Sequence, residues 1–224
     1  MPKSRKPIIR RRPGRPCKDE PDGALLLLQA AQSAFARDGF QAATLRKIAA
    51  SAGLDHALVV HRFGCKEALW NSVIEQQVIY LAPFVTELKE LGKQTKTPIL
   101  VRLETALRQL VAATCGNPEC GMLLSRISSE RGEILDSLIE KLLRPYHDAF
   151  YPLLREAAQA GVIRGQRLET LYFMLIHAVT MTVSYRHIVK YFDETSEDMD
   201  RLKDDMTHLL IENFLRRPHQ GTGR

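Results

Sequence analysis

The chain has 224 residues and a formal net charge of +6, and 45% of its residues are hydrophobic. This length exceeds what a three-helix module needs and leaves roughly 150 residues for a second, larger core. We expect a cytoplasmic protein, because the sequence has no long uncharged apolar run, no apolar signal segment at its basic beginning and no cysteine spacing typical of a disulfide framework.

The basic charge is concentrated in residues 1–18. This segment has eight Lys or Arg residues and no acidic one, so the other 206 residues sum to −2. Its prolines oppose helix formation, and residues 1–21 are therefore expected to be a disordered basic arm. Its RRPGRP segment is like the core of minor-groove-binding hooks, so Arg12 and Arg15 are expected to bind DNA. A solubilising tail remains the alternative.

Residues 25–44 predict a first helix, and Gly39 can provide its C-terminal cap. The apolar positions of this helix recur on one face: Leu27, Ala30, Ala31, Ala34 and Phe35. Thr44 can then cap a second, shorter helix. The apolar face of that helix consists of Leu45, Ile48, Ala49 and Ala52.

Gly53 permits a tight turn after the second helix, because glycine accepts a positive φ without steric cost. Asp55 can cap a third helix, on which Val59 and Phe63 face inward. The side chains left on its other faces are His56, Ala57, Val60 and His61. A longer helix begins at Lys66, and its N-terminal amides favour a phosphate. This order predicts one helix held against DNA.

The motifs TLRKIA at 44–49, AGL at 52–54 and HRFGCKEAL at 61–69 resemble those of the TetR family of bacterial transcriptional regulators, and the resemblance covers roughly residues 25–81. It implies an all-α fold, in which an N-terminal three-helix helix-turn-helix head precedes a larger C-terminal helical domain for ligand binding and dimerisation. After the arm, we expect three regions: the head at 22–70 with its motif at 44–63, the regulatory and dimerisation domain at 71–217, and a tail at 218–224.

The resemblance also implies roles for residues of the head. Thr44 and Lys66 are expected to contact phosphates. Arg62 is expected to contact the DNA backbone, and Arg46 to reach a base edge, where it can pair bidentately with guanine. The expected sequence readers are His56, Ala57, Leu58 and His61. For Arg46 and the neighbouring Lys47, a merely solvated helix face remains the alternative.

Two positions depart from the family pattern. Val60 stands where a tyrosine is common, which removes a phosphate or base contact. Cys65 stands where a capping serine or asparagine is common, which weakens a helix cap. The family's contacts therefore cannot be transferred as a complete set.

Beyond the head, no segment alternates with period two, so no sheet is expected. Residues 115–121 interrupt the helical pattern, and Pro145 and Pro152 should bend or divide a helix at 134–160. Residues 168–189 are apolar on nearly every side, which predicts a fully buried helix. Further helices are predicted at 98–114, 122–129 and 199–214.

The predicted helices at 168–189 and 199–214 resemble the pair that forms a four-helix dimer interface in the family. Their expected interface residues are Leu171, Leu175, Met206, Leu209, Leu210 and Phe214. An isologous homodimer would place two heads on a palindrome whose half-sites lie about 10 to 10.5 bp apart, or a multiple of this.

A ligand cavity would be lined by amphipathic side chains of the middle helices, although a lone His or Met on an apolar face is more often a satisfied core residue. The candidates are Tyr146, His147, Tyr151, Met174, His177, Met181 and Tyr185. A zinc or redox site built on Cys115 and Cys120 is a weaker possibility, because the C-x4-C pair lacks the second ligand pair of a closed zinc site. We expect no metal and no cofactor.

Together these patterns predict a sequence-specific DNA-binding transcriptional regulator with a small-molecule effector. Release of a repressor from a palindromic operator is the expected mechanism, and an activator or architectural protein without an inducer is the alternative. Catalysis is not expected, since no G-x-S-x-G, Walker or H-E-x-x-H motif occurs. The sequence does not specify the operator, the target genes or the effector.

Overall fold

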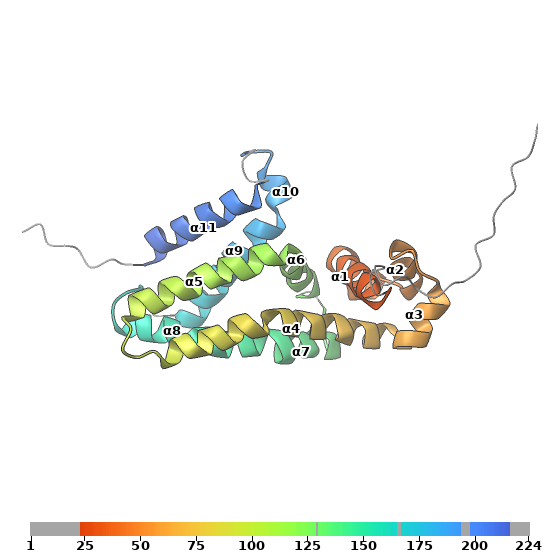
Figure 1. Cartoon of the computed structure of the whole chain (residues 1–224), viewed down its shortest axis with the longest axis horizontal. Helices are drawn as coiled ribbons and strands as arrows, with labels where there is room; N and C mark the ends of the chain where they lie inside the picture. The colour runs from red at the N-terminus through yellow and green to blue at the C-terminus, as the bar shows by residue number, and fades with distance from the viewer. Residues whose placement is uncertain (1–22, 129, 165–166, 194–197, 216–224) are drawn as a thin grey trace, which may run out of the picture.

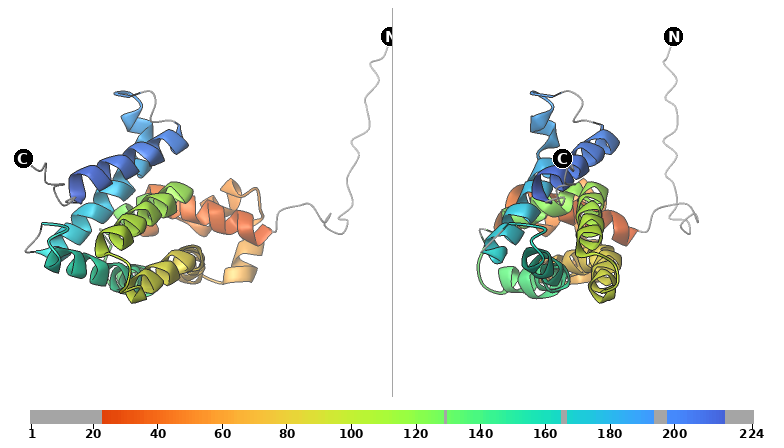
Figure 2. Two further views of the ribbon diagram at one scale, coloured as in Figure 1. Left: turned by 60° about the vertical axis from the view of Figure 1, so that its left-hand side comes forward. Right: turned by 90° about the vertical axis from the view of Figure 1, so that its left-hand side faces the viewer.

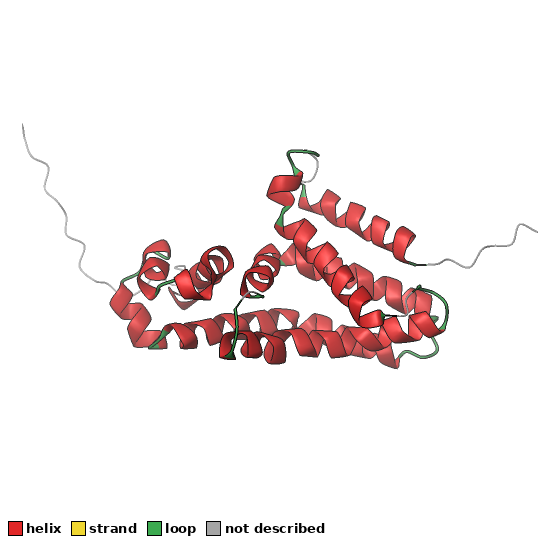
Figure 3. Ribbon diagram, turned by 180° about the vertical axis from the view of Figure 1, so that it is seen from behind, coloured by secondary structure: helices red, strands yellow, loops and turns green. Residues whose placement is uncertain are grey.

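The computed structural model describes residues 23–128, 130–164, 167–193 and 198–215. In these ranges every regular element is a helix and none is a strand, which confirms the expected all-α fold (Figures 1 and 3). No helix in this part of the chain has the length and apolar character needed to cross a membrane. Arg12, Arg15, the rest of the arm at 1–21 and the tail at 218–224 lie outside the described residues.

Four helices build the head and its connection to the remainder: α1 (Gly23–Ala42), α2 (Leu45–Ser51), α3 (His56–Phe63) and α4 (Lys66–Lys93). Gly39, the predicted C-terminal cap, has a φ of 79° and lies inside α1. It kinks the helix at this point, and the helix continues to Ala42. The centre of the head is an aromatic cluster, in which Phe35 and Phe40 stack and both meet the edge of Trp70.

The larger part of the chain contains α5 (Ile99–Gly116), α6 (Pro118–Ile127), α7 (Glu133–Leu138), α8 (Arg144–Gln159), α9 (Leu168–Ser184), α10 (Arg186–Val189) and α11 (Met199–Phe214). The prediction that α6 begins near Met122 was wrong. Pro118 opens the helix within its first turn, where a proline's missing N–H costs no hydrogen bond, so Gly121 is helical as well.

Between α7 and α8 the backbone forms a π-helical turn, η1 (Ile139–Leu143). It ends at Leu143, two residues before Pro145, which cannot donate an intrahelical hydrogen bond. The expected division of the helix near this proline is thereby confirmed as a change of hydrogen-bond register. Pro152 lies inside α8 without ending it.

Two clusters of buried apolar residues form the core. One joins α5, α8, α9 and α11, and α11 crosses this bundle on the side away from α4 (Figure 2). The other fills the head but also includes Cys120, Leu123 and Ile127 of α6. Because α6 packs extensively against both α1 and α9, the head and the larger bundle share one helix.

The expectation that residues 168–189 are buried on every side was wrong for the single chain. Tyr172, Leu175 and Val179 of α9 face the core. The opposite face remains open, with Phe173 51% and Met174 65% exposed. None of the described residues covers that face.

Candidate functional site

Helices α2 and α3 are fixed at their starts by short side-chain caps. Thr44 Oγ1 accepts a hydrogen bond from the Lys47 amide at 3.3 Å, and Asp55 Oδ1 accepts one from the Ala57 amide at 2.7 Å. Between the two helices, Gly53 takes a φ of 69°, which only glycine adopts without strain. Both predicted caps are confirmed, and together with the turn they set the angle between α2 and α3.

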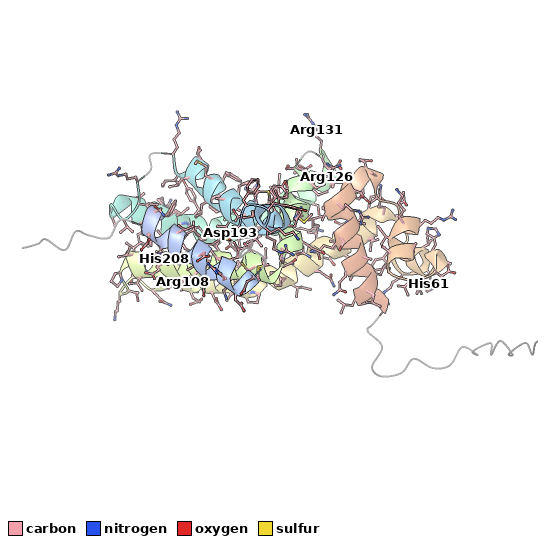
Figure 4. The ribbon with its side chains drawn as sticks, turned by 90° about the horizontal axis from the view of Figure 1, so that it is seen from above. His61, Arg108, Arg126, Arg131, Asp193 and His208 are labelled. Carbon is pink, nitrogen blue, oxygen red and sulfur yellow. The ribbon has the colours of Figure 1, made fainter. Side chains whose placement is uncertain are left out.

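Helix α3 presents nearly all of its surface to solvent. Val59 is its only buried residue. Leu58 is 47% and Val60 40% exposed. His56, Ala57, His61 and Arg62 are exposed as well. Figure 4 places His61 at the end of the molecule remote from α11.

This exposed helix has the dimensions and chemistry to enter a major groove. Leu58 and Ala57 can contact thymine methyl groups, while His61 can offer a ring N–H or nitrogen to a base edge. Thr44, the cap of α2, and Arg46 within α2 are exposed as well. The residues of α2 and α3 that are expected to contact DNA are thus at the surface.

Lys66 is placed differently from the expectation. Its ammonium donates hydrogen bonds to three carbonyl oxygens at the end of α1: Phe40 at 2.9 Å, Gln41 at 3.2 Å and Ala43 at 3.2 Å. It also lies 4.5 Å from the centre of the Phe40 ring. All three ammonium hydrogens are therefore used within the protein, which favours a structural role for Lys66 over the phosphate contact.

Cys65 precedes α4 and makes no side-chain hydrogen bond to the helix start. The expected weakening of this cap is confirmed. Lys66 compensates for it, because its bonds to the end of α1 attach the same turn of α4 to the head.

A narrow cavity of about 70 Å³ lies where α4, α5, α6, η1, α8 and α9 meet. Its wall is mainly apolar, and Tyr80, Asn117, Tyr146 and Tyr172 supply most of the polar groups. A wider cavity of about 440 Å³ adjoins it and shares Leu124, Tyr172 and Ile176 with it.

The sequence candidates for the ligand site are divided between these cavities and the surface. Tyr146 lines the narrow cavity, and His147, His177 and Met181 line the wider one. Tyr151, Met174 and Tyr185 line neither; Tyr151 stacks on His147 with ring centres 5.0 Å apart, and the other two are exposed. Sequence reasoning missed Tyr80, Asn117 and Tyr172, because helical periodicity marks them only as core or connection.

Neither cysteine of the C-x4-C pair is in a metal-binding arrangement. Cys115 and Cys120 are both free, and no cluster of three or more His, Cys, Asp or Glu side chains suited to a metal occurs among the residues that the structure describes. Burial raises the pKa of the Cys120 thiol to about 12, so it remains protonated at neutral pH and is a poor metal ligand or nucleophile.

Three side-chain amides, those of the buried Gln32 and Gln77 and of the half-buried Asn117, connect the cavity with the head. Gln77 Nε2 donates to Gln32 Oε1 at 2.9 Å, Gln32 Nε2 donates to Asn117 Oδ1 at 3.2 Å, and Asn117 Nδ2 donates to Gln77 Oε1 at 2.7 Å. The three bonds form a closed ring across α1, α4 and the start of α6. Asn117 also lines the narrow cavity, so one residue contacts both regions.

Other contacts of α6 reinforce this connection. Ser33 of α1 donates to the Glu119 carboxylate at 3.0 Å, and Arg126 lies where α6 meets α1 (Figure 4). On the other side, a Cβ on Gly121 would lie 2.5 Å from Ser184 Oγ, so this glycine is needed for the close approach of α6 to α9. Helix α6 is therefore held tightly between the head and α9.

The family model described as "Bacterial regulatory proteins, tetR family" matches residues 27–73, which include α2, α3 and the capped turn between them. This part of the chain therefore matches the DNA-binding, helix-turn-helix head of TetR-family transcription regulators. No curated protein sequence matches the chain.

Solved structures share the TetR fold over most of the chain. HlyIIR, a haemolysin II transcriptional regulator, is 20% identical with a TM-score of 0.59, covering 83% of this chain and 97% of its own. FadR from Bacillus subtilis, in complex with stearoyl-CoA, is 18% identical with a TM-score of 0.57, covering 85% and 98%. FadR from Bacillus halodurans is 16% identical with a TM-score of 0.58, covering 92% and 100%.

The residues expected at a TetR-type dimer interface are only partly available for one. Leu175 and Met206 are buried in the core of their own chain, and Leu171, Leu210 and Phe214 pack against that core. Leu209 is 57% exposed. The exposed apolar face of α9 instead carries Phe173 and Met174, because the sequence period marks an apolar helix without showing which of its faces the chain itself covers.

Proposed function

We propose that the protein is a TetR-family repressor that leaves a palindromic operator when a small molecule occupies the cavities beside α6. One observation carries the proposal: α6 lines the narrow cavity with Cys120, Gly121 and Leu124, and the same helix packs along α1 of the head. A ligand that displaces α6 must also change the position of α1. The stearoyl-CoA bound to Bacillus subtilis FadR supports a small-molecule effector.

The effector must bind the DNA-free state more tightly than the DNA-bound state, since equal affinity for both would shift nothing. A hundredfold loss of operator affinity corresponds to a coupling free energy of about 2.7 kcal/mol. Movement of α6, which packs against both the head and α9, can supply a coupling of this size.

The exposed side of α9 supports a homodimer. Phe173 and Met174 lie beside each other on a face that the described residues leave uncovered, and a second copy can cover it by twofold symmetry. Two heads would then face successive major grooves, as a palindromic operator requires. The regulator would act on bacterial chromosomal DNA, in the cytoplasm.

We infer a division of labour along the chain: residues 22–70 read DNA, residues 71–217 bind effector and partner, and the arm at 1–21 adds charge. The boundary falls within α4, whose residues Trp70, Val73 and Ile74 still belong to the core of the head. In the head, Thr44 and Arg62 contact the DNA backbone and Arg46 a base edge. The sequence readers are His56, Ala57, Leu58 and His61.

Footprinting and binding titrations on the DNA upstream of the protein's own gene test this function. We expect protection of a palindrome and, at about 150 mM salt, binding at least a thousandfold tighter than to a random duplex. Equal affinity for the two duplexes would rule out a specific regulator. A reporter gene under that operator separates repression from the alternative, activation or an architectural role without an inducer.

The arm can be tested by deleting residues 2–18. If Arg12 and Arg15 reach the minor groove, the log–log salt dependence of operator binding should flatten by about 0.9 for each lost phosphate contact. An unchanged slope would identify the arm as a solubilising tail. Titration with candidate small molecules then tests the release step on the same operator.

A further inference from the structure

We propose that the narrow cavity beside α6 takes an uncharged, mainly apolar small molecule that makes a hydrogen bond with the Tyr146 hydroxyl. This inference rests on the proposed function, because it defines the chemistry of the effector. It differs from what the stearoyl-CoA complex of Bacillus subtilis FadR would lead one to expect for this chain, since coenzyme A is highly anionic.

The wall of the cavity contains no charged side chain. Apolar groups from five elements surround the space, among them Leu81, Leu110, Leu124, Leu142 and Ile176. An ion entering it would lose its hydration without gaining a partner of opposite charge, which is strongly unfavourable. The lining thus selects against carboxylates, phosphates and ammonium groups.

The adjoining wider cavity does not supply a free cation for an anionic end of a ligand either. Its wall includes Arg144, which donates to the Glu140 carboxylate at 2.8 Å and 3.0 Å. It also includes His147, which lies 2.9 Å from Asp148 and 3.1 Å from Glu169. A ligand anion would have to displace these carboxylates from Arg144 and His147. The third basic residue of this wall, His177, lies with Nδ1 2.8 Å from the Phe173 carbonyl oxygen of its own helix.

Tyr146 supplies the specific polar contact. The residue is only 8% exposed, it lines the cavity, and its hydroxyl has no hydrogen-bond partner in the described part of the protein. Its ring stacks on Phe150 with centres 6.2 Å apart, which fixes the direction of the hydroxyl. Burial raises the pKa of Tyr146, so the group stays protonated and can donate.

An unpartnered hydroxyl in an apolar wall lowers the affinity for a purely apolar ligand and raises it for one that offers a matching polar atom. Tyr172 is a second hydroxyl-bearing residue of this wall, and burial raises its pKa, so its hydroxyl also stays protonated. A neutral molecule with one or two oxygen or nitrogen atoms and an apolar body therefore fits the cavity best.

The test uses four single-ring probes of nearly equal size on the full-length protein without DNA: benzyl alcohol, benzoate, benzylammonium and toluene. Dissociation constants come from ligand-observed NMR titrations. We expect benzyl alcohol to bind at least tenfold more tightly than benzoate and benzylammonium. Equal or tighter binding of either ion would overturn the proposal.

Two variants locate the binding. Tyr146→Phe keeps the ring and its packing, and it should weaken benzyl alcohol three- to tenfold while leaving toluene within twofold. Leu124→Trp fills the shared wall of both cavities and should weaken all four probes. If Tyr146→Phe bound benzyl alcohol as the wild type does, the hydroxyl would have no part in recognition and the proposal would fail.

These outcomes are independent of the regulatory function. A protein that selects neutral probes through Tyr146 but never leaves its operator would disprove ligand-controlled release and preserve the cavity chemistry. A protein that leaves its operator when an anionic effector binds would support ligand-controlled release and disprove the proposed cavity chemistry.

Discussion

Asn117, which lines the narrow cavity, donates a hydrogen bond of 2.7 Å to the side-chain oxygen of Gln77. This bond ties the start of α6 to α4. Gln32 closes the ring, so that each of three amides donates once and accepts once. Gln77 is 2% and Gln32 7% exposed. A buried ring of this kind tolerates little displacement, because moving one member leaves the other two with unsatisfied groups.

Asn117→Ala should therefore destabilise the protein measurably. Gln32 and Gln77 each lose one partner, and a buried unsatisfied group costs about 1–3 kcal/mol. Each kcal/mol corresponds to about 2–4 °C in melting temperature for a chain of this size. Thermal unfolding measures the difference, with the exposed Gln29 of α1 as the control (Gln29→Ala). Equal melting temperatures for the two variants would contradict a role for the ring.

The structural role of Lys66 gives a second prediction. Lys66→Met keeps the aliphatic stem but removes the donor to Phe40 and its neighbours, so stability should fall by about 1.5–3 kcal/mol. The slope of operator binding against salt should remain unchanged, since no phosphate contact is lost. The exposed Lys47 provides the comparison. A flatter salt slope for Lys66→Met, without loss of stability, would support the phosphate contact and contradict the structural role.

The features of the head that could be predicted from the sequence are local ones. Thr44, Asp55 and Gly53 act within a few residues of their own position, as helix caps and a turn, and the structure places all three as predicted. Val59 and Phe63 are four residues apart on one helix, and this spacing predicts that both face inward. Val59 is buried, and Phe63 packs against the core of the head. Capping and periodicity are properties of short segments, so one sequence contains enough information for them.

The features that could not be predicted depend on which elements meet. Lys66 has the spacing of a phosphate contact, but the end of α1 happens to present three carbonyl groups to it. Asn117 lies in a stretch that the sequence marks only as a helix break. Tyr172 is one apolar position among many in α9. Contacts between distant segments decided all three roles, and no local pattern encodes such contacts.

His147 predicts a dependence of stability on pH. Burial lowers its pKa, but hydrogen bonds with Asp148 and Glu169 outweigh this effect, and the net result is a raised pKa. The contribution of His147 should thus be complete below its unfolded value of about 6.5 and disappear as pH rises through the raised folded value.

Melting temperatures between pH 5.5 and 8.5 test this, with His147→Gln as the reference. The melting temperature of the wild type should exceed that of the variant by less as the pH rises. Glu169→Gln should reduce this difference, because the carboxylate that pairs with His147 Nε2 is lost. An advantage that grows with pH would contradict the assigned pairing.

The exposed face of α9 gives the last prediction. Met174 is 65% exposed, and the proposed dimer would bury it at the contact between the two copies. Met174→Glu would place a carboxylate from each copy in an apolar interface, so the dimer dissociation constant should rise at least a hundredfold, equivalent to about 2.7 kcal/mol. Sedimentation velocity over a concentration series measures it. Ile79→Glu is the matched control, since Ile79 is 72% exposed on α4, and it should leave the association unchanged. If both variants sediment as the wild type does, α9 does not form the interface, and the spacing of the two heads must be set by another surface.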